Sequence, residues 1–183
     1  MREVTHSTER VRDGQGVHVR PATPDDKEKL GDMFVRLSPQ TIYRRLHTPY
    51  PRVPEWMIAW FADAAHHDGE RLVAVAGDDI VGHAMYVGPD SGHEAEIALV
   101  VEDRWQSKGV GKLLLRDLAD RAESRNIEAF TGLTLAENRR VLDLIGAVFS
   151  SSEYEIRDGS YYFRIPLREG TRKPDPWMSR SAA

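Results

Sequence analysis

The sequence predicts an α/β or α+β domain built around a mixed β-sheet. Three observations predict it: helix-like segments precede the first apolar runs, strand-like runs gather between residues 71 and 135, and helical patterns interrupt and follow those strands. With 183 residues the chain is long enough for a single domain with a sizeable core. We expect that domain over residues 17–167, with flexible tails at 1–16 and 168–183.

The first part of the domain is predicted to be mainly helical. Thr23-Pro24-Asp25-Asp26 combines a cap residue, a proline and early acids, which is typical of a helix N-terminus. Ser38-Pro39 repeats the cap and proline. Large apolar residues recur at helical spacing between Trp56 and Phe61. The predicted elements are a strand at 17–19 and helices at about 24–37, 39–46 and 56–61.

The second part is predicted to alternate strands with helices. The turn Gly77-Asp78-Asp79 between two apolar runs is typical of a β-hairpin. Period-two and helical patterns then follow one another to the end of the domain. The predicted elements are a hairpin at 72–76 and 80–87, strands at 93–101 and 127–135, helices at 109–124 and 137–145, and late strands at 152–156 and 161–167.

Composition narrows the function classes. The chain has no cysteine, so thiolate metal ligands and cysteine nucleophiles are excluded. The net charge of −4 gives no general attraction to nucleic acid or to an anionic membrane. No apolar run is long enough to span a bilayer, and the N-terminus has no signal-peptide core. We therefore expect a cytoplasmic protein that binds neither nucleic acid nor a membrane. His66-His67-Asp68 is typical of a solvated loop, and no metal site is expected.

A glycine-rich turn between a predicted strand and a predicted helix indicates a phosphate site. The segment 106–112 contains Gly109 and Gly111, which let a phosphate approach the backbone at a helix N-terminus. A nucleotide-triphosphate loop is excluded, because Gln106 replaces its first glycine and Leu113 its magnesium-binding hydroxyl. The dinucleotide fingerprint also fails, since Leu114 occupies the place of its third glycine.

Gln106-x-x-Gly109-x-Gly111 instead resembles the pyrophosphate loop of the GCN5-related N-acetyltransferase (GNAT) family, [QR]-x-x-G-x-[GA]. The run 95–101 before the loop resembles the fourth strand of that family, and 135–142 after it resembles the fifth strand and a helix that starts with an asparagine. The resemblance implies a GNAT fold with a mixed, mostly antiparallel sheet of about six to seven strands flanked by helices. It also implies acetyl-coenzyme A (acetyl-CoA) as cosubstrate.

The resemblance further implies which residues hold the cofactor. Main-chain groups near Leu99 would meet the thioester oxygen, Val101 would pair with the pantetheine arm, and amides of the glycine loop would meet the diphosphate. Asn138 would touch the arm through its side chain. The predicted cofactor-binding residues are Leu99, Val100, Val101, Gln106, Ser107, Lys108, Gly109, Val110, Gly111, Lys112 and Asn138.

Glu96 is the predicted catalytic residue. Alternation places Glu94, Glu96, Ala98 and Val100 on one face of the strand. Burial of a carboxylate in the cleft would make it a stronger base, which suits Glu96 to accept a proton from the acceptor amine. In similar enzymes a glutamate at this position has that role. Glu94, nearer the start of the strand, would bind substrate or face solvent.

The acceptor is left open between several classes. Residues 37–46, L-S-P-Q-T-I-Y-R-R-L, resemble a segment of the acetyltransferase domains of Pat-type bacterial protein-lysine acetyltransferases. This implies a protein lysine, such as one on an acyl-CoA synthetase. The alternatives are a small amine (a polyamine, an aminoglycoside or an amino acid) and a non-catalytic module that senses acetyl-CoA.

No general acid for the leaving group is predicted. In many members of the family a tyrosine protonates the coenzyme A thiolate as it leaves, but Ile145 occupies the corresponding position in this sequence.

Overall fold

The computed structural model describes residues 9–10, 14–63, 69–88, 93–168 and 170–174. Their strands form one sheet in the order β1-β2-β3-β4-β5-β6-β8-β7. Only the β5–β6 pair is parallel, which confirms the predicted mixed, mostly antiparallel sheet. The strands are β1 Glu9–Arg10, β2 Gly16–Pro21, β3 Gly69–Ala76, β4 Asp79–Val87, β5 Glu94–Val101, β6 Ala129–Leu135, β7 Glu153–Arg157 and β8 Ser160–Pro166. Strand β1 has two residues, pairs with β2 and lies within the segment 1–16 that was predicted to be a flexible tail.

Five α-helices accompany this sheet in the described part of the chain. They are α1 Lys27–Arg36, α2 Pro39–Leu46, α3 Glu55–Ala62, α4 Val110–Ser124 and α5 Arg139–Val148. The predicted first helix is divided, since Pro24–Asp26 forms a 3₁₀ turn before α1. Helix α5 continues through Gly146 to Val148 instead of ending near Ile145. No described helix has the length and apolar character needed to cross a membrane.

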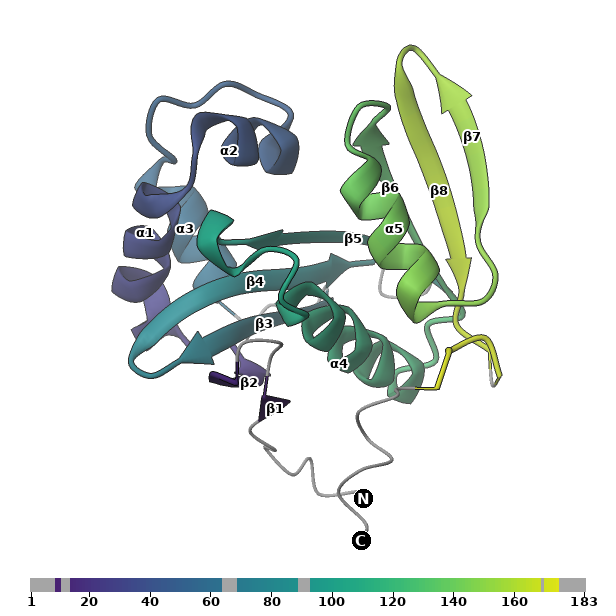
Figure 1. The fold of residues 1–183 in the computed structure, drawn as a ribbon, viewed down its shortest axis with the longest axis horizontal. Coiled ribbons are helices and arrows are strands. Elements are labelled where there is room, and N and C mark those ends of the chain that lie inside the picture. Colours follow the sequence, from purple (N-terminus) through teal and green to yellow (C-terminus); the bar gives the residue numbers. More distant parts are fainter. Residues whose placement is uncertain (1–8, 11–13, 64–68, 89–92, 169, 175–183) are drawn as a thin grey trace, which may run out of the picture.

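The helices cover the two faces of the sheet separately (Figure 1). Residues of α4 and α5, such as Leu114 and Ile145, pack into the core on one face. Residues of α1 and α3, such as Met33 and Phe61, pack into a second core on the other face. Helix α4 lies so close to β4 that a Cβ at Gly82 would come 2.9 Å from Leu114 Cδ1. This packing fixes the start of α4 against the sheet.

Two buried basic side chains hold the end of α3. Arg71 Nε donates a hydrogen bond to the Trp60 carbonyl (3.0 Å), and His83 Nε2 lies 3.2 Å from the Phe61 carbonyl. Burial, and then the positive charge of Arg45, lower the pKa of His83 to about 3, so the ring is neutral near pH 7 and donates through Nε2. These contacts satisfy carbonyls that the end of a helix leaves without partners.

The segment 170–174 packs beside the end of α5. The Thr171 carbonyl accepts a hydrogen bond from the Ser150 N–H (2.7 Å), and the Lys173 N–H donates to the Val148 carbonyl (2.8 Å). These contacts extend the ordered backbone past β8, into a segment for which the sequence indicated no regular structure.

Candidate active site

The sheet divides between β5 and β6. The two strands pair over three positions, the last of which joins Glu96 to Thr131. Beyond that point residues 97–101 pair with β4, and residues 132–135 pair with β8. The second half of β5 therefore has one open edge.

Main-chain groups of β5 point into this split. The Glu102 N–H donates to the Val81 carbonyl (2.9 Å), and β4 and β5 keep one register up to that point. Alternate residues of an antiparallel strand bond to the same neighbour, so Val100 directs its N–H and C=O toward β4. The intervening residues Ile97, Leu99 and Val101 direct theirs toward the split. Three residues of β5 were predicted to bind the cofactor. Leu99 and Val101 offer main-chain groups to the cleft, and Val100 does not.

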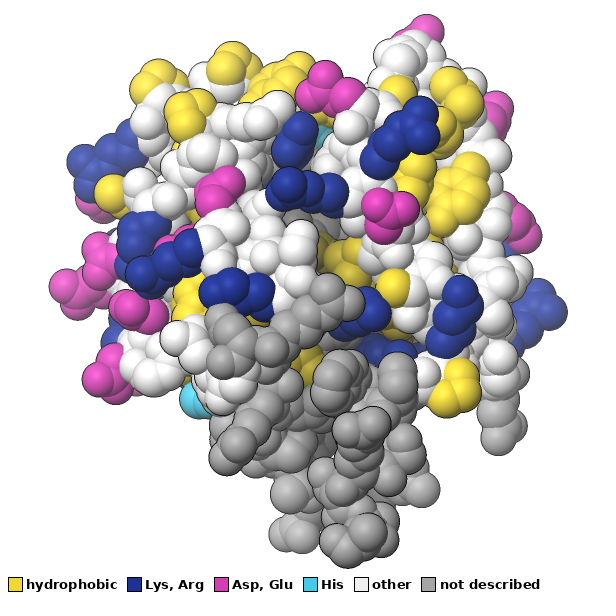
Figure 2. Space-filling view, in the orientation of Figure 1, with side chains coloured by type: hydrophobic (Ala, Val, Ile, Leu, Met, Phe, Trp, Pro, Cys, Tyr) yellow, Lys and Arg dark blue, Asp and Glu magenta, His cyan; other side chains and the backbone are white. Residues whose placement is uncertain are grey.

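A cavity of about 1300 Å³ follows the split, and Figure 2 shows Lys and Arg side chains gathered around a hollow in the middle of this face. Its walls come from β5, the glycine loop, α4 and α5 at one end, and from α2 and α3 at the other. The lining includes every predicted site residue except Val110, whose fully buried side chain lies in the core: Glu96, Leu99, Val100, Val101, Gln106, Ser107, Lys108, Gly109, Gly111, Lys112 and Asn138.

The glycine loop has the backbone conformation that an anion site requires. Ser107 and Gly109 have positive φ angles of 61° and 109°. Gly109 precedes α4, so the amides of Val110 and Gly111 lie in the first turn, where a helix supplies no acceptor for them. Such amides favour a negative group at this end of the cavity.

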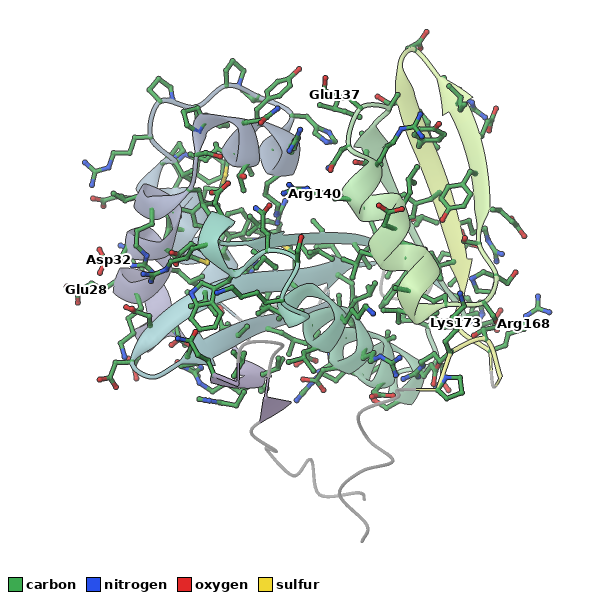
Figure 3. The ribbon with its side chains drawn as sticks, in the orientation of Figure 1. Glu28, Asp32, Glu137, Arg140, Arg168 and Lys173 are labelled. Atoms are coloured by element: carbon green, nitrogen blue, oxygen red, sulfur yellow. The ribbon has the colours of Figure 1, made fainter. Side chains whose placement is uncertain are left out.

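Gln106 joins the loop to three other parts of the site. Its Nε2 donates to the Val101 carbonyl (3.0 Å), and its Oε1 accepts from Arg140 Nη1 (2.5 Å). Its Nε2 also lies 3.4 Å from Thr41 Oγ1 in α2. Figure 3 shows Arg140 reaching from α5 into the space between α5 and α2. Gln106 thus positions the loop and also occupies one of the open carbonyls of β5.

Asn138 lies at the start of α5, on the cavity wall. Its Nδ2 donates to Thr134 Oγ1 (3.2 Å), and its amide oxygen has no hydrogen-bond partner among the described residues. The side chain is nearly buried, so the oxygen can meet an N–H group that enters the cavity. Ile145, further along α5, is buried and supplies no hydroxyl.

The turn before the loop is anchored to α2 through Asp103. Its carboxylate accepts hydrogen bonds from the Ser38 N–H (2.9 Å), the Ser38 hydroxyl (2.9 Å) and the Thr41 hydroxyl (2.8 Å). Partial burial would raise the pKa of Asp103, but these hydrogen bonds outweigh it and lower that pKa. The serine and threonine of the L-S-P-Q-T segment therefore hold α2 against the start of the cofactor loop.

Glu96 lies at the base of the split, where β6 leaves β5. It belongs to the same face as Ala98 and Val100, which pack with α1 and α3, and the predicted alternation is correct. The expected burial of Glu96 is wrong: its side chain is exposed, because the strands separate at this point and admit solvent. Glu94 is also exposed and forms an ion pair with Arg164 Nε (2.7 Å).

Sequence reasoning missed two arginines in α2. Arg44 and Arg45 are not among the predicted site residues, yet both line the cavity and both are half-buried. Arg45 lies over the Phe61 ring (5.1 Å from its centre). Burial lowers the pKa of Arg45 to about 10, while the negative charge of Glu96 acts in the opposite direction. The available signal was helical spacing. Arg45 follows the buried Ile42 by three positions, so the two side chains are neighbours on the surface of α2.

Metal-binding geometry is not found in the described ranges, which contain no group of three or more His, Asp or Glu side chains that could hold an ion. The His66-His67-Asp68 loop lies outside the described residues.

Comparison with known proteins places the chain in a family. The model described as "Acetyltransferase (GNAT) family" matches residues 34–146, more than half of the chain. A relative is the acetyltransferase Pat of Mycolicibacterium smegmatis, which is 29% identical over 148 residues. That alignment covers 76% of this chain and 43% of Pat, so the chain spans less than half of this relative's length.

Solved structures agree with this family match. The GNAT domain of S. lividans PAT superposes with a TM-score of 0.82 at 26% identity, over 91% of this chain and 99% of that domain. A GNAT-superfamily phosphinothricin acetyltransferase from Sinorhizobium meliloti, in complex with acetyl-CoA, has a TM-score of 0.67 at 17% identity, over 87% of this chain and 94% of that one. That second likeness concerns the fold alone. The family model, the Pat sequence and the S. lividans fold together identify this chain as an acetyltransferase of the GNAT family.

Proposed function

We propose that the protein transfers the acetyl group of acetyl-CoA to a primary amine, with a protein lysine as the favoured acceptor, by direct attack in a ternary complex. The observation that carries the proposal is the split beside β5: Glu96 lies at its base, open main-chain groups lie along it, and the glycine loop lies at its far end. This order matches that of acetyl-CoA, in which the pantetheine arm joins the diphosphate at one end to the acetyl thioester at the other.

The cofactor site would be assembled mainly from main chain. The diphosphate would lie on the amides of Gly109 to Lys112, with Lys108 and Lys112 supplying positive charge that the chain as a whole lacks. The pantetheine arm would pair with the open edge of β5 and meet Asn138. The acetyl-CoA in the S. meliloti structure supports this cosubstrate.

Glu96 would act as general base. The ammonium of the acceptor loses a proton to Glu96, directly or through water, and the neutral nitrogen attacks the thioester carbonyl carbon. A tetrahedral oxyanion forms, which the Leu99 N–H stabilises. The C–S bond then breaks and coenzyme A leaves as a thiolate. The new amide nitrogen gives its second proton to that thiolate or to water, so the C–N bond remains in a neutral amide. A thiol pKa near 8.5 permits departure without an acid, so the lack of a tyrosine at Ile145 is compatible with turnover.

The acceptor follows from the Pat resemblance. Similarity to M. smegmatis Pat and to the S. lividans domain supports a protein lysine as acceptor, for instance one on an acyl-CoA synthetase. The exposure of Glu96 is compatible with this, because a lysine side chain entering from a protein surface must reach the base through an open mouth. Small amines and an acetyl-CoA sensor are the alternatives.

The decisive experiment compares Glu96→Gln with Glu94→Gln. Loss of the base should lower kcat/KM for amine acetylation about 10²- to 10⁴-fold while the calorimetric Kd for acetyl-CoA stays unchanged. Glu94→Gln, in the same strand but paired with Arg164, is the matched control and should retain most activity. Undiminished transfer in Glu96→Gln contradicts the mechanism. Binding of acetyl-CoA with no transfer to any protein or amine in the wild type favours the sensor.

A further inference from the structure

Arg44 and Arg45 place two positive charges in the cavity, and the described part of the chain supplies no matching carboxylate. Both Nε atoms are buried and have no hydrogen-bond partner among the described residues. Within the described residues, Arg45 Nη2 donates a hydrogen bond to Met85 Sδ (3.4 Å), which is a weak acceptor. No carboxylate of the described residues lies within ion-pair distance of either side chain.

Three other half-buried arginines of this protein are neutralised. Arg20, 29% exposed, pairs with Asp26 at 2.6 Å, and Arg36, 30% exposed, pairs with Glu102 at 3.0 Å. Arg121 lies between Glu70 and Asp117. A guanidinium that has lost water normally gains such a partner, because an unpaired buried charge is costly. The surroundings of the two α2 arginines are therefore those of an anion-binding site.

The phosphates of acetyl-CoA do not account for this anion. The glycine loop follows the Val101 end of β5, whereas Arg45 interacts electrostatically with Glu96 and touches Met85, the partner of Ala98. Glu96 and Val101 are five positions apart, or about 16 Å along an extended strand. The loop end of the cavity has its own cations in Lys108 and Lys112. Arg45 therefore belongs to the acceptor end, and Arg44, its neighbour in α2, lines the same cavity.

We infer that Arg44 and Arg45 form an anion subsite that selects acceptors with a carboxylate close to the reacting amine. This inference rests on the proposed function. Glu96 would take the amine and the arginines the carboxylate, while the Phe61, Trp60 and Trp56 side chains line the apolar wall between α2 and α3. Guanidinium groups bind carboxylates through paired, charge-assisted hydrogen bonds.

The carboxylate can come from two sources. In a free amino acid it belongs to the acceptor itself, and in a protein it belongs to an aspartate or glutamate beside the acceptor lysine. The recognition chemistry is the same in both. Matched acceptor pairs separate them: amino acids against their carboxamides, and peptides with glutamate against glutamine beside the lysine.

The test measures kcat/KM for each member of these pairs with labelled acetyl-CoA. The wild type should acetylate the carboxylate member about 10- to 100-fold more efficiently, either in the amino-acid pairs or in the peptide pairs. The kind of pair that shows this preference identifies the source of the carboxylate. Arg45→Gln and Arg44→Gln should each reduce that preference toward unity while the rate with the neutral member changes little. Arg45→Lys should keep part of it. Arg52→Gln, an exposed arginine outside the cavity, is the control.

Two results overturn the inference. Equal rates within every pair for the wild type leave the acetyltransferase proposal intact and remove the subsite. An equal loss for charged and neutral acceptors in both glutamine variants, with unchanged melting temperatures, means that the arginines support the fold of the site and not its selectivity. If no amine is acetylated by the wild type, the proposed function itself fails, and the subsite with it.

Discussion

The two ends of the cleft are built from different chemistry. The cofactor end relies on main chain: the open edge of β5 and the first turn of α4. The acceptor end relies on side chains, among them Glu96, Arg44, Arg45 and the aromatic residues of α3. A surface made of backbone tolerates many side chains but demands a particular fold, whereas a surface made of side chains changes with single substitutions. The contrast predicts which substitutions matter at each end.

The strongest test of the backbone end is Gly111→Glu. Its Cβ would lie 3.3 Å from Leu144 Cδ2, and its carboxylate would add negative charge where the diphosphate is proposed to lie. Calorimetry should detect no acetyl-CoA binding. Gly146→Glu makes the same change in α5 at a site with nothing within 4 Å of the new Cβ, and it should bind normally. An unchanged Kd in Gly111→Glu would remove the loop assignment.

A smaller effect is expected from Gln106→Ala. The substitution removes the links from the loop to Val101 and Arg140 and exposes the Val101 carbonyl to the cleft. Two lost hydrogen bonds of about 1 kcal/mol each correspond to a Kd for acetyl-CoA raised by up to about thirtyfold. Arg140→Ala removes one of the two links and should give an intermediate Kd. Equal Kd values for all three proteins would mean that the loop keeps its conformation without Gln106.

Asp103→Asn tests the junction between the two ends. Removing the charge weakens three hydrogen bonds to α2 and should lower the free energy of unfolding by about 1 kcal/mol in urea denaturation at pH 7. Because the pKa of Asp103 is lowered in the folded state, its contribution is present above the ordinary aspartate pKa of about 4 and is lost as pH falls through the folded value. The difference between the two proteins should therefore shrink toward pH 3.

The smallest effect is expected from Leu99→Ala. If Leu99 acts through its N–H, truncation of its partly buried side chain should change the acetyl-CoA Kd less than Gln106→Ala does. The thermal melting temperature reports the lost packing separately. A large rise in Kd at an unchanged melting temperature would show that the side chain itself binds cofactor, and it would weaken the distinction between the two ends.

Most of the fold and the cofactor end could be predicted from local signals. Ser38-Pro39 marks the start of α2, the turn at residues 77–78 joins β3 to β4, and Gly109 precedes α4, because caps, turns and positive φ angles depend on neighbouring residues. The divided first helix and the continuation of α5 past Gly146 were less accessible, since tertiary packing outweighs weak local preferences at helix ends.

The sequence by itself determined the order of elements, the glycine loop and the family, because those depend on short-range patterns that the chain carries in order. Only the tertiary structure decided the surroundings of each charge. Glu96 has the predicted position in its strand, yet it is exposed because β6 leaves β5 there, and Arg45 loses water because α3 packs Phe61 beneath it. Solvent exposure and charge pairing arise between segments distant in sequence, so no local pattern encodes them.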